Sequence, residues 1–240
     1  MGYKAFFRQI LNFFHLDLTK NLEYDRLTKR IMKEVIQPDS NCIDVGCHKG
    51  EILEDILRLA PNGKHIAFEP IPVFYTKLEQ RYNDRATILP YALSDKNGKS
   101  SFQYVKNAPA YSGIEKRKYN IDNPEIEEIE VELKTLDDII RETEKINFVK
   151  IDVEGGEFDV LKGGEKVLAA NKPTIIFEFG KGASEYYGTE PNDLFKFLTE
   201  KIGLNVYLLK SFLNQDKPLS EEDFSKCYSE NHEYYFVAHS

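Results

Sequence analysis

Short apolar runs alternate with longer amphipathic stretches along most of the chain. The runs that we expect to be strands cover residues 42–45, 65–68, 87–92, 147–152, 174–179, 205–209 and 234–238. Helices are expected over 52–59, 73–82, 160–168 and 193–199. Such alternation is typical of βαβ units, so the fold class is predicted to be α/β, with a mostly parallel sheet covered by helices on both faces. The last two strands lack a convincing helix between them and are expected to form an antiparallel edge pair.

Two segments depart from this rhythm. Residues 1–37 carry apolar side chains near a helical period and Pro38 ends the pattern, so 1–38 is expected to be an N-terminal helical cap on a main domain of 39–240. Aromatic residues beside Lys4 and Arg8 leave a peripheral membrane contact open as the alternative. Within 94–134 we expect an inserted pair of strands, joined by a loop over 107–126 that acts as a mobile lid or binding loop.

The charge balance limits the partners. The 240 residues include 32 Lys and Arg against 40 Asp and Glu, a net charge of -8. A large nucleic-acid-binding surface needs a net positive charge, so no nucleic-acid partner is expected. No apolar run is long enough for a transmembrane segment, and Arg8 interrupts the N-terminal run that could be a secretory signal. The cysteines Cys42, Cys47 and Cys227 form no CxxC pair, which favours reduced thiols and a cytoplasmic location.

The segment 43–50, Ile-Asp-Val-Gly-Cys-His-Lys-Gly, ends one predicted strand and begins a helix. Glycines at such a turn let the backbone approach a ligand, and the helix N-terminus offers free N–H groups. The dinucleotide fingerprint GxGxxG would require glycines where His48 and Glu51 stand, and no GK[ST] of a P-loop follows. The turn therefore predicts a ligand loop that does not bind pyrophosphate, with Asp44 placed to attract an ammonium group.

Acidic residues also follow other predicted strands. Glu69 ends the second strand, where a carboxylate accepts hydrogen bonds from ribose hydroxyls in both NAD and S-adenosylmethionine sites. Asp152 ends a later strand, Glu154 and Glu157 follow it, and Glu178 lies at the end of the next. Because the carboxyl ends of parallel strands share one edge of a sheet, we expect these acids to lie close together. Acids also favour helix N-termini, so helix capping is the structural alternative.

Six short motifs occur in a fixed order: Asp-Val-Gly-x-x-x-Gly at 44–50, Phe-Glu-Pro at 68–70, Ala-Leu-Ser-Asp at 92–95, Thr-Leu-Asp-Asp at 135–138, Lys-Ile-Asp-Val-Glu-Gly-x-Glu at 150–157 and Phe-Glu at 177–178. Together they resemble the FkbM family of S-adenosylmethionine-dependent methyltransferases, over residues 41–180. The resemblance implies a Rossmann-like, seven-stranded class I methyltransferase sheet whose last strand is antiparallel, in agreement with the edge pair above.

The resemblance also implies roles for individual residues. S-adenosylmethionine would be bound by Asp44, Gly46, Cys47, His48, Gly50, Glu69, Pro70, Ala92 and Asp152. Glu69 would hold the ribose hydroxyls and Ala92 would frame the adenine, while Asp152 and Glu154 would face the methyl group and the acceptor. His48 stands where the family commonly has Asn, and a Ser-rich segment is reduced to residues 111–113, which bears on acceptor choice.

The expected function is O-methylation of a hydroxyl on a sugar, a polysaccharide or a glycosylated natural product. A hydroxyl acceptor needs a general base, and the candidates are Asp152 and Glu154, with Glu178 or His232 as further catalytic candidates. The alternatives are a non-catalytic binding protein on the same scaffold and methylation of a non-sugar acceptor. The missing GxGxxG counts against a nicotinamide dehydrogenase. The histidines lack zinc-ligand spacing, so no zinc site is expected and no metal ligands are assigned. A need for Mg or Ca at the carboxylate cluster is left open, as is a homo-oligomer.

Overall fold

The computed structural model describes residues 19–119 and 121–240. The part of the predicted helical cap in residues 1–18 lies outside these described residues. Within them, one sheet has the strand order β3-β2-β1-β7-β8-β10-β9. Its strands are β1 (Cys42–Val45), β2 (His65–Phe68), β3 (Thr87–Leu89), β7 (Phe148–Ile151), β8 (Thr174–Glu178), β9 (Asn205–Leu208) and β10 (Tyr235–His239). Strand β10 runs antiparallel to β8 and β9, and the first five pair in parallel, which confirms the predicted α/β fold with an antiparallel last strand.

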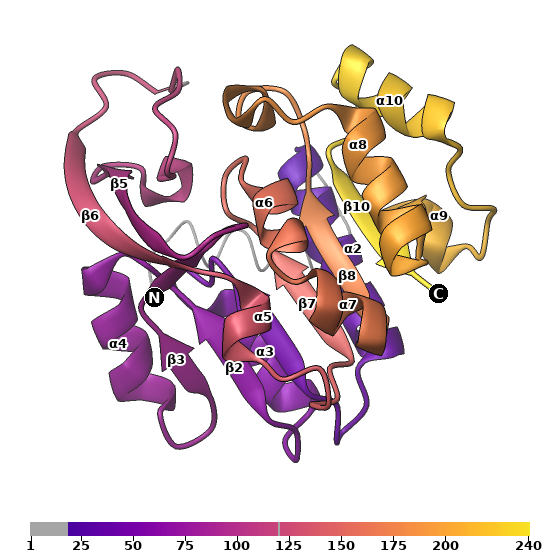
Figure 1. Ribbon diagram of the computed structural model, residues 1–240, viewed down its shortest axis with the longest axis horizontal. Coiled ribbons are helices and arrows are strands. Elements are labelled where there is room, and N and C mark those ends of the chain that lie inside the picture. Colours follow the sequence, from indigo (N-terminus) through magenta and orange to yellow (C-terminus); the bar gives the residue numbers. More distant parts are fainter. Residues whose placement is uncertain (1–18, 120) are drawn as a thin grey trace.

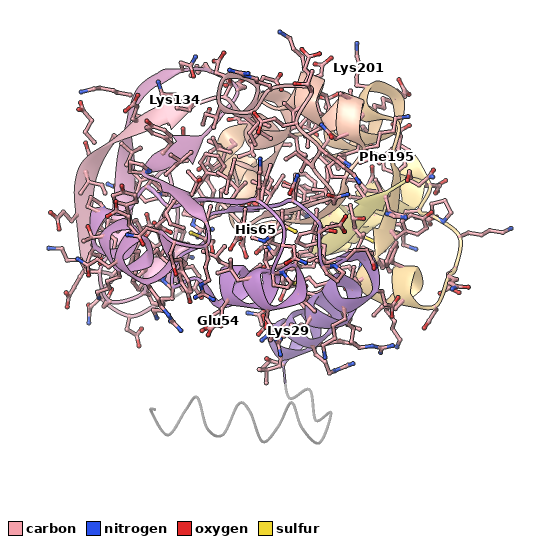
Figure 2. All side chains as sticks on the ribbon, turned by 90° about the horizontal axis from the view of Figure 1, so that it is seen from below. Lys29, Glu54, His65, Lys134, Phe195 and Lys201 are labelled. Atoms are coloured by element: carbon pink, nitrogen blue, oxygen red, sulfur yellow. The ribbon has the colours of Figure 1, made fainter. Side chains whose placement is uncertain are left out.

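Helices cover both faces of this sheet. One face packs against α2 (Lys20–Val35), α3 (Glu51–Leu59), α4 (Pro72–Tyr82) and α9 (Leu209–Leu213). The other packs against α5 (Leu136–Ile139), α6 (Glu157–Lys162), α7 (Glu165–Asn171), α8 (Pro191–Lys196) and α10 (Glu221–Glu230). Adjacent strand residues point to opposite faces, so Cys42 joins the first core and Ile43 the second. In Figure 2, Lys29 and Glu54 lie on one side, Phe195 and Lys201 on the other, and His65 lies between.

The inserted strands form a separate three-stranded sheet in the order β4-β6-β5. Its strands are β4 (Tyr91–Leu93), β5 (Gly98–Val105) and β6 (Ile126–Lys134). The single strand predicted over 87–92 is wrong, because Pro90 separates β3 in the main sheet from β4 in the small one. Proline has no N–H to donate, and a change of sheet at this residue leaves no ladder bond unmade. Figure 1 shows β5 and β6 above α4, on the opposite side of the molecule from α8 and α10.

The antiparallel edge pair was predicted without helices between its strands, and this detail is wrong. Helices α9 and α10 separate β9 from β10, and β10 inserts between β8 and β9 so that β9 forms the edge. Only Phe224 and Cys227 of α10 are buried, which leaves too narrow an apolar stripe to be read as a helix. The Ser220 hydroxyl caps this helix by accepting a hydrogen bond from the Asp223 N–H at 3.1 Å.

Helix α2 confirms the helical expectation for its part of the N-terminal region. Thr19 caps it, and Tyr24, Leu27, Ile31 and Met32 are buried on one face, against the core formed with the sheet. This placement brings the start of α2 close to the residues that lead into β10. In the described part of the chain, no helix has the length and apolar character needed to cross a membrane.

Candidate active site

A pocket opens at the edge where the parallel strands end. Open α/β sheets bind ligands at this edge, because their loops diverge there. Of the residues predicted to bind a cofactor or to act in catalysis, those that line this first pocket are Gly46, His48, Glu69, Pro70, Ala92, Asp152 and Glu154. The small sheet and its following loop supply further lining residues, which are Tyr91, Leu93, Phe102, Pro109, Ala110, Ser112 and Ile114. The first pocket therefore lies between the main sheet and the insertion.

The turn after β1 approaches the turn after β7 very closely. Gly46 has φ +77°, and a Cβ placed on it would lie 2.0 Å from the Asp152 carbonyl oxygen. The Gly46 N–H donates to the Phe68 carbonyl at 3.0 Å, which ties this turn to β2. His48 also has a positive φ of 48°, and its ring packs edge-on against Phe74 with centroids 4.6 Å apart. Only glycine fits at Gly46, so the sequence motif follows from the close contact between the two turns.

Glu69 holds the end of β2 against this turn. One carboxylate oxygen accepts a hydrogen bond from the His48 N–H at 2.7 Å, and the other accepts from the Ile71 N–H at 2.8 Å. Burial raises the pKa of Glu69 to about 7, while these two N–H groups oppose the shift. Each oxygen keeps a second lone pair. Glu69 is thus a fixed acceptor at the wall of the first pocket.

Three of the predicted cofactor residues lie behind the pocket wall. The Asp44 carboxylate accepts a hydrogen bond from the Leu53 N–H in the first turn of α3, and burial raises its pKa to about 7 while Lys150 opposes the shift. Its Oδ2 atom is buried without a hydrogen-bond partner among the described residues. Gly50 caps the same helix at φ +78°, and the buried Cys47 thiol has a raised pKa. Their positions support the turn and place none of their side chains in the first pocket.

One carboxylate oxygen of Asp152 accepts two hydrogen bonds from the protein. The Lys150 ammonium lies 3.0 Å from Asp152 Oδ2, and the Tyr235 hydroxyl donates to the same oxygen at 3.0 Å. Lys150 is buried, and its Nζ lies 4.9 Å from the centroid of the Tyr235 ring. No described residue donates a hydrogen bond to Oδ1, and the Asp152 side chain is one-third exposed. One oxygen is therefore fixed by the protein, and the other is available to a ligand.

Two further acids lie beneath Asp152. Glu157 Oε1 accepts from the N–H groups of Val153 at 3.1 Å and Gly155 at 3.2 Å, so it closes the turn before α6. Burial raises the pKa of Glu157 to about 8, and the Glu178 charge adds to the shift. Burial, followed by the charges of Asp152 and Glu154, also raises the pKa of Glu178. Glu157 is buried and accepts from residues before α6, and α6 has no side-chain cap, so these contacts do not support the solvated helix-capping alternative for Glu157.

The described part of the loop 107–126 lines both pockets, which agrees with the expected binding loop. Arg117 forms an ion pair with Glu154 and donates hydrogen bonds to the carbonyls of Tyr111 at 3.1 Å and Gly182 at 3.4 Å. The Tyr187 hydroxyl accepts from the N–H of Ile114 at 3.2 Å. Burial raises the pKa of Glu154, and Arg117 opposes the shift. Arg117 and Tyr187 thus attach the loop to the turns after β7 and β8, while its mobility stays a prediction.

Because Arg117 makes several of these contacts, we expect the order of the loop to depend on its positive charge. Replacing Arg117 by Gln removes the ion pair to Glu154, whose side chain is largely buried and is then left without its cation. We expect amide hydrogen exchange in residues 109–119 to be at least tenfold faster in Arg117→Gln than in the unchanged protein. Lys116→Gln removes an exposed charge from the same loop and is the control. Equal exchange in the two variants would show that other contacts hold the loop.

A second pocket adjoins the first. The two share Ala110, Asp152 and Glu154, so these residues form the boundary between them. Glu178 lines only the second pocket, and His232 lies outside both. Sequence reasoning assigned no role to Lys150, Tyr187 or Tyr235, and it placed Arg117 in the loop over the acceptor without its partner Glu154. Among the described residues, no group of three or more His, Cys, Asp and Glu side chains could hold a metal ion.

The fold and this edge of the sheet define a Rossmann-like methyltransferase scaffold. Residues 44–203 match the family described as "Methyltransferase FkbM domain", and the chain belongs to that family. It is similar to 2-O-methyltransferase NoeI of Sinorhizobium fredii, at 27% identity over 61% of this chain and 66% of the relative. It is also similar to the hexuronic acid methyltransferase AglP of Haloferax volcanii, at 30% identity over 71% of this chain and 66% of the relative.

A solved structure supports the fold. The methyltransferase FkbM from Methylobacillus flagellatus matches 91% of this chain and 52% of its own, with a TM-score of 0.50 and 15% sequence identity. The chain spans slightly under two thirds of the two curated relatives and about half of this solved chain. The predicted family membership is therefore confirmed, and a methyl donor is implied by it.

Proposed function

We propose that the protein is an S-adenosylmethionine-dependent O-methyltransferase that methylates a hydroxyl of a sugar, a polysaccharide or a glycosylated natural product. The observation that carries the proposal is the shared boundary of the two pockets at Asp152 and Glu154. A donor in the first pocket and an acceptor in the second would meet at these carboxylates. Among relatives, the names of NoeI and AglP record a 2-O-methyltransferase and a hexuronic acid methyltransferase, which supports a sugar acceptor.

The residues of the first pocket fit S-adenosylmethionine. Glu69 offers two fixed carboxylate oxygens to the ribose hydroxyls, and Gly46 leaves room where any side chain would strike the backbone. Pro70 and Ala92, with the Phe102 ring, supply an apolar wall suited to the adenine. When bound, the cofactor supplies a methyl group on a positively charged sulfur. Asp44, Cys47 and Gly50 would act from behind by supporting the loop that contacts it.

Asp152 is the proposed general base. Its Oδ2 is occupied by Lys150 and Tyr235, which fix the carboxylate in one orientation. Its other oxygen is then free to accept the proton of an acceptor hydroxyl in the second pocket, and positioning of this kind supplies much of the rate gain. Glu154 is committed to Arg117, so its proposed role is to hold the loop over the site. Glu178 remains the second candidate for the base.

Calorimetry with three ligands tests the cofactor assignment. S-adenosylmethionine and S-adenosylhomocysteine should each bind at micromolar affinity, and NAD should not bind, because the loop lacks the glycines that admit a pyrophosphate. Binding of NAD more tightly than S-adenosylmethionine would overturn the proposal. Binding of S-adenosylmethionine with no methyl transfer to any acceptor would instead support the non-catalytic alternative.

Glu69→Gln should weaken S-adenosylmethionine by about 1–3 kcal/mol, the usual effect of losing a hydrogen bond to a charged acceptor, which is a factor of roughly 5 to 150 in Kd. The change keeps the size of the side chain, but its single amide oxygen can accept from only one of the His48 and Ile71 N–H groups, so the expected loss combines the missing charge with one missing hydrogen bond. Calorimetry measures it, with Glu79→Gln on the exposed face of α4 as a matched control. Unchanged affinity in Glu69→Gln would remove Glu69 from the proposed ribose site.

A further inference from the structure

The two pockets draw on different parts of the chain. Every residue that lines the first pocket falls within 45–187, inside the segment 44–203 that the family shares. The second pocket has one wall from that segment and another wall from the flanks of the chain. The flank residues of this wall are Thr19, Asn21, Leu22, Tyr24, Asp25, Asn231, Tyr234 and Tyr235. We call them the flank wall. The donor side is thus built from shared sequence, and the flank wall is not.

The flank wall is held together as one unit. The Tyr234 hydroxyl donates to Asn21 Oδ1 at 2.5 Å, and the Tyr24 hydroxyl donates to Glu233 Oε2 at 2.5 Å. The Tyr24 ring stacks on Tyr235 at 5.0 Å between centroids, with its edge toward Tyr234 at 4.8 Å. These contacts join α2 to the segment before β10. The same Tyr235 holds Asp152, so the flank wall is connected to the boundary between the pockets.

The chemistry of the flank wall suits a ligand rich in hydroxyls. Asn21 and Asn231 are exposed amides, each with donors and an acceptor, and the phenol rings beside them are amphipathic. Of the acids that line this pocket, Asp152 and Glu154 are each paired with a cation, and burial raises the pKa of Glu178, so these three side chains present less negative charge to the ligand. Amides next to aromatic faces match the hydroxyls and the apolar C–H faces of a sugar ring.

We infer that the flank wall recognises the acceptor, as a sugar ring seated between α2, the segment 231–235 and the loop residue Tyr111. The inference rests on the proposed function and adds to it the residues that select the substrate. It assigns specificity to segments outside the shared family region. Relatives with the same donor pocket and different flanks should then accept different sugars.

A double variant, Asn21→Ala with Asn231→Gly, tests the flank wall. Alanine favours the first turn of α2, and glycine keeps the left-handed backbone at Asn231, where φ is +50°, so both changes remove an amide without straining the fold. Lys33→Ala, on the exposed surface near the other end of α2, is the matched control. Each protein is given methyl-labelled S-adenosylmethionine and the saccharide fraction of its source cells, and cofactor affinity is measured separately by calorimetry.

The double variant should bind S-adenosylmethionine within twofold of the unchanged protein and need at least tenfold more saccharide for half-maximal labelling. The Lys33→Ala control should match the unchanged protein in both measurements. Unaltered labelling by the double variant would overturn the flank wall and leave the proposed function standing. An unchanged protein that labels no saccharide would overturn the proposed function, and the inference with it.

A loss of cofactor binding in the double variant would indicate a wider change in the fold. In that case Tyr234→Phe serves as the second test of the flank wall, because it removes one hydroxyl and the hydrogen bond that this hydroxyl donates to Asn21. We expect this variant to need several-fold more saccharide while its cofactor affinity stays unchanged. Wild-type labelling by Tyr234→Phe would overturn the inference.

Discussion

Asp152→Asn should lower methyl transfer by about 10²–10⁴-fold, the usual loss when a general base is removed. The amide keeps the size of the side chain, and its oxygen can still accept hydrogen bonds from Lys150 and Tyr235. What it loses is the ability to take a proton from the acceptor. Cofactor affinity should therefore stay within roughly tenfold, and raising the pH should not restore turnover. Single-turnover transfer from labelled S-adenosylmethionine measures the first effect, and calorimetry measures the second.

Two variants of neighbouring residues distinguish the loss of a general base from the loss of the contacts around it. Tyr235→Phe removes one donor to Asp152 and keeps the carboxylate, so it should lose much less activity than Asp152→Asn. Glu154→Gln weakens the ion pair to Arg117, and its main effect should be on acceptor KM through the loop. Full turnover by Asp152→Asn would exclude Asp152 as the base and make Glu178, which lies at the end of β8, the residue to test.

The sequence was sufficient to predict the fold class and the edge where the site lies. Gly46, Glu69 and Asp152 each follow a predicted strand, and parallel strands bring their carboxyl ends to one edge. Strands β1 and β7 are buried on both faces, and each is apolar apart from one charged residue, Asp44 in β1 and Lys150 in β7. Pro90 carried a signal for the break between β3 and β4, since proline is rare inside a central strand.

The contacts that complete the site come from residues far apart in the chain. Arg117 pairs with Glu154 37 positions away, and Tyr235 reaches Asp152 across 83 positions. Nothing in the local pattern around Tyr235 indicates this contact. It depends on β10 entering the sheet beside β8, opposite Glu178 in register. Insertion of the last strand between two earlier ones is a property of the whole topology.

Asp44 shows a different limit of sequence reasoning. Its place in the motif predicted a ligand contact, but its carboxylate lies behind the first pocket and receives the Leu53 N–H of α3. An acid near the start of a helix satisfies one of the N–H groups that the helix leaves free. An acid at this position could therefore contact a ligand or bind the start of the helix. Only the direction of its side chain distinguishes the two roles.

Gly46→Ala should both destabilise the protein and abolish cofactor binding. The added Cβ would lie 2.0 Å from the Asp152 carbonyl oxygen, which belongs to backbone and cannot swing aside. Either the turn after β1 or the turn after β7 must move, and both turns line the first pocket. Left-handed strain of about 1–2 kcal/mol and overpacking of about 1–3 kcal/mol together predict a loss near 3 kcal/mol in the free energy of unfolding. For a chain of this size, that lowers Tm by roughly 6–12 °C.

Gly188→Ala separates the two causes of this loss. Gly188 has a similar φ of +66°, but a Cβ placed on it meets no atom within 4 Å. This control should therefore show only the backbone strain and keep its affinity for S-adenosylmethionine, because nothing at the strand ends must move. Thermal unfolding and calorimetry on both variants make the comparison. If Gly46→Ala behaves like Gly188→Ala in both measurements, the close contact between the two turns does not shape the cofactor site. If it alone loses binding, the glycine of the first motif is required because the Asp152 backbone occupies the space of a side chain.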